Sequence, residues 1–77
     1  MKPSTARVLA LLRANGSHGL SDLEALEHAH TTRLAARIHE LRFMEHYTIT
    51  ATLETHNGVR YARYVLREEP EQMVVGL

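Results

Sequence analysis

The side chains best suited to chemistry in this 77-residue chain are six histidines and nine lysine or arginine residues. His28 and His30 are two residues apart and His39 and His46 are seven apart, so no third ligand falls at the spacing of a zinc site. No cysteine is present. The serines, histidines and glutamates are not spaced as a nucleophile with its base, and no glycine-rich phosphate loop occurs. We therefore expect no metal, no cofactor and no enzymatic activity, with the histidines adding positive charge below about pH 6.

The arginines are unevenly placed, although the formal net charge is zero. Residues 31–67 carry six arginines against three glutamates, which gives +3, and residues 68–77 carry three glutamates, which gives −3. A zero total argues against a strongly basic nucleic-acid binder. The local excess of arginine still favours contacts with phosphate in the middle of the chain.

The elements that position these side chains must form one small domain. A chain of this size buries only about 60% of its unfolded surface, and without cysteine it depends on helix packing, oligomerisation or both. No apolar stretch approaches the roughly 20 residues of a membrane span, and the N-terminus does not resemble a signal peptide. We expect a cytoplasmic protein that makes no membrane contact.

Two helices are predicted in the first half of the chain. Ser4 is a candidate N-cap for a helix over residues 4–15, and Asn15-Gly16 supplies its C-terminal stop. Ser21 and Glu24 form a capping box that opens a short second helix. The leucines expected to be buried by that helix are Leu23 and Leu26.

A third helix is predicted from a cap at Thr31 or Thr32 to about Met44. Leu34, Ile38 and Leu41 share one stripe at helical spacing, and we expect the helix to end before Glu45. The residues expected on its outer face are Arg33, Ala36, Arg37 and Glu40, with Phe43 pointing almost directly away from the core.

After the third helix the apolar period changes from 3.6 to 2, which predicts strands. Asn57-Gly58 indicates a two-residue type I′ hairpin, so His56 pairs with Val59 and every pair sums to 115. One face of this hairpin is then apolar, and we expect it to pack on the helices. Its residues are Ile49, Ala51, Leu53, Ala62, Tyr64 and Leu66.

Three helices followed by a hairpin is the layout of a winged helix-turn-helix. The stretch LSDLEALEHAHTTRLAARIHELR and the later GVRYARYVL resemble the small winged helix-turn-helix domains of phages and prophages, over about residues 7–67. The fold class is thus mainly α with a β-hairpin, with a domain over residues 1–67 and a tail over 68–77. The sequence departs from the family pattern at His30, where a glycine is usual, and at 43–45, where basic residues and a glycine are usual.

The resemblance implies a regulator of phage genes, with the third helix in the DNA major groove and the hairpin as a wing on the backbone. The residues expected to contact DNA are Thr32, Arg33, Ala36, Arg37, Arg60, Tyr61 and Arg63. Two alternatives need no ligand: a solvated helix face, and cross-strand pairing of Arg63 with Thr52 and of Tyr61 with Glu54. Because about four phosphate contacts per protomer are few, DNA binding favours a homodimer.

A second hypothesis is an inhibitor of a host defence complex, of the anti-CRISPR or anti-restriction kind, built on the same scaffold. It suits the zero net charge and Phe43-Met44-Glu45. We expect one of Phe43 and Met44 to pack under the hairpin, and we make no prediction for the other. The apolar tail residues are either without fixed structure or an arm that crosses to a second protomer. They are Met73, Val74, Val75 and Leu77.

Overall fold

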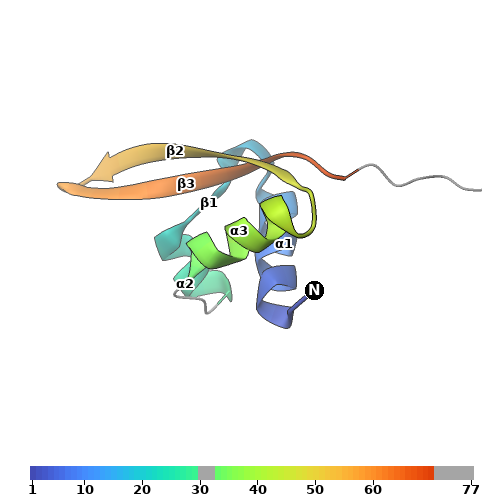
Figure 1. The fold of residues 1–77 in the computed structure, drawn as a ribbon. Helices are drawn as coiled ribbons and strands as arrows, with labels where there is room; N and C mark the ends of the chain where they lie inside the picture. Colours follow the sequence, from blue (N-terminus) through green and yellow to red (C-terminus); the bar gives the residue numbers. More distant parts are fainter. Residues whose placement is uncertain (30–32, 71–77) are drawn as a thin grey trace, which may run out of the picture.

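The structure is a computed structural model that describes residues 1–29 and 33–70. The predictions made for the contacts and conformations of His30, Thr31, Thr32, Met73, Val74, Val75 and Leu77 lie outside the described residues. The predicted cap of the third helix at Thr31 or Thr32 is wrong, because α3 begins at Leu34 and its N-cap is Arg33, without a side-chain hydrogen bond. The elements are α1 (Pro3–Asn15), the 3-10 turn η1 (Gly16–His18), β1 (Leu20–Ser21), α2 (Asp22–Ala29), α3 (Leu34–Phe43), β2 (Thr48–His56) and β3 (Val59–Glu68). The expected three helices and antiparallel hairpin are therefore present, and the helices lie on one side of the hairpin (Figure 1).

The first helix starts one residue earlier than predicted. Pro3 occupies its first turn and Lys2 is the N-cap, without a side-chain hydrogen bond, so the predicted Ser4 cap is wrong. Proline suits this position because its missing N–H would have no helical partner there. The predicted stop is confirmed: Gly16 has φ 54° and its N–H bonds to the Leu12 carbonyl.

The capping box of the second helix is confirmed. The Ser21 N–H donates to Glu24 Oε1 at 3.0 Å, and the Glu24 N–H donates to Ser21 Oγ at 3.3 Å. The predicted buried face is wrong, however, because Leu23 and Leu26 are 64% and 47% exposed and Ala25 is buried instead. The side of α2 that faces the protein lies between Glu24 and Ala25. Because successive residues of a helix are 100° apart, Leu23 and Leu26 lie nearly on the opposite side.

The core joins α1, α3 and the base of the sheet. The predicted stripe of α3 is confirmed, since Leu34, Ile38 and Leu41 are all at most 2% exposed. The helix ends at Phe43, before Glu45, as predicted. The other members of the core cluster are Val8, Leu9, Leu12, Leu20, Ala25 and Ile49.

The register of the hairpin is confirmed. Every pair from Ile49–Leu66 to His56–Val59 sums to 115, and a bulge shifts the register only at Thr48. Asn57 and Gly58 have φ values of 52° and 77°, as a type I′ turn requires.

The burial expected for the hairpin is only partly correct. Ile49 is buried, but Ala51 is exposed and Leu53 is 67% exposed. The reason is length: the outer half of the hairpin extends past the helices, so its apolar face has nothing to pack against there (Figure 1). Val65, on the opposite face, is 6% exposed instead.

The sheet also has a third strand that the sequence pattern did not predict. β1 pairs antiparallel with β3 through Leu20–Tyr64 and Ser21–Arg63, which gives the strand order β1-β3-β2. Gly19 makes this approach possible, because it has φ 72° and a Cβ there would lie 2.3 Å from the Tyr64 carbonyl oxygen.

Candidate nucleic-acid interface

Arg37, expected on the outer face of α3, lies against α1 instead. Its side chain is 16% exposed, with Nη2 2.8 Å from Glu40 Oε1 and Nη1 3.2 Å from Ser4 Oγ. Glu40 also accepts hydrogen bonds from the Thr5 hydroxyl and Lys2. The hydrogen bond from Thr5 lowers the pKa of Glu40 most. The hydrogen bond from Lys2 and the positive charge of Arg37 lower it further. The outer-face placement of Arg37 and Glu40 is therefore wrong, since both join α3 to α1.

Arg63 joins the hairpin to α2 in a similar way. Its Nε is 2.8 Å from Glu54 Oε1, and its Nη1 is 2.7 Å from Glu24 Oε1 and 3.1 Å from the His18 carbonyl oxygen. Only 19% of the side chain is exposed. The Thr52–Arg63 and Glu54–Tyr61 pairings are present, as the cross-strand alternative predicted, but Glu54 is the ion partner of Arg63.

This network changes the acidity of its members. Burial raises the pKa of Glu24, but hydrogen bonds from His18, Ser21 and Arg63 outweigh it and lower the pKa to about 2. The Glu54 hydrogen bond, and then those of Glu24 and Tyr61, raise the pKa of Arg63. The ion pair thus holds its charges throughout the neutral pH range.

Three further arginines also bond within the protein. Arg42 donates twice to the Ile49 carbonyl oxygen, at 2.7 and 3.0 Å, and Arg67 donates to Thr50 Oγ1 at 3.0 Å. Arg13 donates from Nε to Glu69 at 3.0 Å. These contacts connect α3, the hairpin and α1, so they stabilise the fold.

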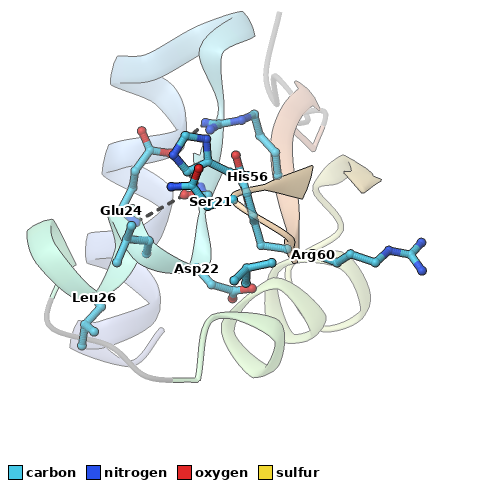
Figure 2. A pocket seen from close by; sticks show the side chains of 11 residues that line it. Ser21, Asp22, Glu24, Leu26, His56 and Arg60 are labelled. Carbon is cyan, nitrogen blue, oxygen red and sulfur yellow. Dashed lines mark hydrogen bonds and ion pairs between the residues drawn. The ribbon is translucent and has the colours of Figure 1, made fainter. Parts of the chain in front are cut away.

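Arg60 differs from these arginines. It follows the hairpin turn, is exposed, and has no hydrogen bond or ion pair with any described residue. Its side chain extends away from the other labelled residues into solvent (Figure 2). Arg33, directly before α3, is also exposed, as is Arg7 on α1. The Arg60 guanidinium therefore has no ion pair with a described residue to lose when it meets a phosphate.

A groove lies between α2 and the outer half of the hairpin. We call it the α2–hairpin groove, and its volume is about 760 Å³. Its apolar lining consists of Leu23, Leu26, Val59 and Tyr61 (Figure 2). The Glu24–Arg63 ion pair also borders it.

Residues 4–69 match the family model described as winged helix-turn-helix domain. The chain belongs to the winged helix-turn-helix family. No curated protein and no solved structure matches it. In this winged helix-turn-helix domain, α2 and α3 stand in the places of the helix-turn-helix pair and β2–β3 in that of the wing. We call α3 the recognition helix after the helix that holds its place in the motif. The family is consistent with DNA binding, as the resemblance implied.

In these terms the predicted DNA-contact residues separate into two groups. Arg33 and Arg60 are exposed, at the start of the recognition helix and at the tip of the wing, and Ala36 and Tyr61 are half-buried beside them. Arg37 and Arg63 are bound to carboxylates. The partner Glu54 was not predicted, yet the register places it diagonally beside Arg63 on the same face of the wing.

The end of the recognition helix is apolar and exposed. Phe43 and Met44 are 66% and 70% exposed, so the expectation that one of them packs under the hairpin is wrong. Tyr47 packs against the core there, and Arg42 bonds to the base of the wing. The His39 ring lies 4.7 Å from that of Phe43, measured between ring centroids.

Two searches of the described residues bear on other functions. No group of three or more histidine, cysteine, aspartate or glutamate side chains is arranged to hold a metal ion in residues 1–29 and 33–70. Within those same ranges, no helix is long and apolar enough to cross a membrane.

Proposed function

We propose that this domain binds double-stranded DNA as a homodimeric regulator or architectural factor of a phage or prophage, in the cytoplasm of the host bacterium. The observation that carries the proposal is Arg60, a cation without a partner in residues 1–29 and 33–70, at the tip of a wing that extends beyond the helices (Figures 1 and 2). The start of the recognition helix, with Arg33, enters the major groove, and the wing with Arg60 and Tyr61 contacts the backbone.

This arrangement predicts a modest salt dependence. Each neutralised phosphate contributes a slope of about −0.9 to log K against log salt, which is roughly 3.5-fold between 50 and 200 mM salt. Two contacts, by Arg33 and Arg60, give a monomer a loss of about 12-fold over that range. A homodimer with four contacts loses about 150-fold.

The test is fluorescence anisotropy with a random DNA duplex at several salt concentrations. The Arg60→Ala variant is compared with Arg7→Ala, which also removes an exposed arginine but from α1, outside the helix-turn-helix pair and the wing. We expect Arg60→Ala to reduce the salt slope by about 0.9 per protomer and Arg7→Ala to leave it unchanged. Equal effects of the two variants, or no binding near 50 mM salt, contradict the proposal.

The second candidate is the inhibitor of a host defence complex, and the exposure of both Phe43 and Met44 favours it. Neighbouring exposed apolar side chains, next to the His39 ring, suit a protein partner more than DNA. A plating assay tests it: the protein should protect phage from a host restriction or CRISPR system, and Phe43→Ser should abolish protection. Protection that survives Phe43→Ser and Met44→Ser rules out this surface.

A further inference from the structure

The α2–hairpin groove exposes leucines that the sequence pattern predicts to be buried. Leu23 and Leu26 are 64% and 47% exposed on one of its walls, and Val59 is 64% exposed on the other. No described segment covers these three side chains. Apolar side chains gathered around one concave site indicate that another segment binds there.

The wall formed by β3 also has an open edge. β1 pairs with β3 only at Tyr64 and Arg63, and at Asp22 the chain turns into α2. From Ala62 to Val59, no described strand therefore lies on this side of β3. In a two-residue hairpin, the two residues of the closing pair, His56 and Val59, hydrogen-bond to each other. Backbone groups of successive residues in a strand point to opposite edges, so the N–H and C=O of Arg60 point to the open edge of β3. Such an edge pairs readily with an added strand.

The sequence of this protein contains a segment that fits the site. Residues 73–75 read Met-Val-Val and Leu77 follows, so the segment combines apolar side chains with β-branched residues suited to a strand. To reach the groove of its own copy, this segment would have to reverse its direction after β3 ends at Glu68 and then run back along β3. β1 also occupies the intervening edge at Tyr64.

We propose that residues 73–77 of a second copy add to β3 as a strand beside residues 59–62, with their apolar side chains on Leu23 and Leu26. The exchange is reciprocal, so two arms and two grooves close a two-fold dimer. Arg60 lies at the border of the groove, and its side chain extends away from the other labelled residues, which leaves the guanidinium available for DNA (Figure 2). The inference concerns assembly and does not depend on DNA binding.

The first test measures the mass of the full chain in solution, by light scattering, from about 10 to 500 μM. We expect the wild type to dimerise, and both Leu26→Glu and Val74→Glu to weaken dimerisation at least tenfold. Phe43→Glu is the matched control, since it places the same charge on another exposed apolar residue, outside the groove. Mixing Leu26→Glu with Val74→Glu should restore a heterodimer, because one copy supplies an intact arm and the other an intact groove.

The second test uses the absence of cysteine from the chain. We expect Val59→Cys and Val75→Cys, mixed as separate proteins in a glutathione buffer, to form a disulfide-linked heterodimer in preference to either homodimer. This readout does not depend on whether a charged variant folds. A wild type that stays monomeric at 500 μM overturns the proposal. A dimer that persists in Val74→Glu also overturns it, and then a different surface of the second copy occupies the groove.

Discussion

Two arginines on the wing, Arg60 and Arg63, are three residues apart, and the structure gives them different roles. Replacing Arg63 with methionine keeps a long flexible side chain but removes the guanidinium that bonds to Glu24, Glu54 and the His18 carbonyl. The carboxylate of Glu24 then loses a charged partner while remaining only 26% exposed. We expect Arg63→Met to destabilise the fold and Arg60→Met not to.

The size of the effect follows from the contact with Glu24 alone. A hydrogen bond to a charged group contributes about 1.5 to 3 kcal/mol, and partial exposure of the pair reduces this by roughly a third to a half. We therefore expect the free energy of unfolding to fall by about 1 to 1.5 kcal/mol. For a domain of this size, 1 kcal/mol corresponds to roughly 4–8 °C, so the Tm should fall by about 4 to 12 °C.

The assay is thermal unfolding at pH 7, followed by circular dichroism at 222 nm, for the wild type and both variants. Arg60→Met is the control, because replacing an exposed residue that has no partner in the described part of the chain changes stability by less than about 0.5 kcal/mol. A Tm for Arg63→Met within 1–2 °C of the wild type (well below the expected shift of about 4 to 12 °C) refutes the reasoning. An equal loss in Arg60→Met refutes it as well.

Two further predictions concern Glu24 and Gly19. The folded pKa of Glu24 is about 2 against an ordinary 4.5, so its carboxylate contributes stability above about pH 5 that is lost as the pH falls toward 2. The contribution is at most about 3 kcal/mol. Thermal unfolding between pH 2 and 7 should show that Glu24→Gln loses less stability on acidification than the wild type; an identical dependence of Tm on pH in the two proteins contradicts this. Gly19→Ala brings a Cβ to 2.3 Å from the Tyr64 carbonyl oxygen, whereas nothing lies within 4 Å of a Cβ at Gly16. Unfolding in guanidinium should therefore show that Gly19→Ala lowers the free energy of unfolding by about 3 kcal/mol or more. Gly16→Ala adds only backbone strain and should lower it by about 1–3 kcal/mol. Equal losses in the two variants contradict the clash.

The features that were predictable from the sequence are local. The Asn57-Gly58 turn and the period-2 pattern beside it set the hairpin register, because a one-residue slip reverses every side chain. The stripe of Leu34, Ile38 and Leu41 needs only helical spacing, and the capping box of Ser21 and Glu24 lies within four residues.

The features that were not predictable depend on packing between distant segments. The partner of Arg63 on α2 is 39 residues away, and that of Arg37 on α1 is 33 residues away, so periodicity does not reveal that these side chains are engaged. β1 has two residues, too few for any alternation. The orientation of α2 is set by Ser21 and the sheet, and it exposes the leucines that amphipathic patterning would bury.

The most direct measurement of the central claim is an NMR titration of the ¹⁵N-labelled protein with a random DNA duplex near 50 mM salt. DNA binding through the recognition helix and the wing predicts amide shift changes concentrated at residues 33–36 and 59–61. Phe43 and Met44, at the other end of α3, should change little. An unchanged spectrum, or changes confined to residues 43–45, would contradict the account.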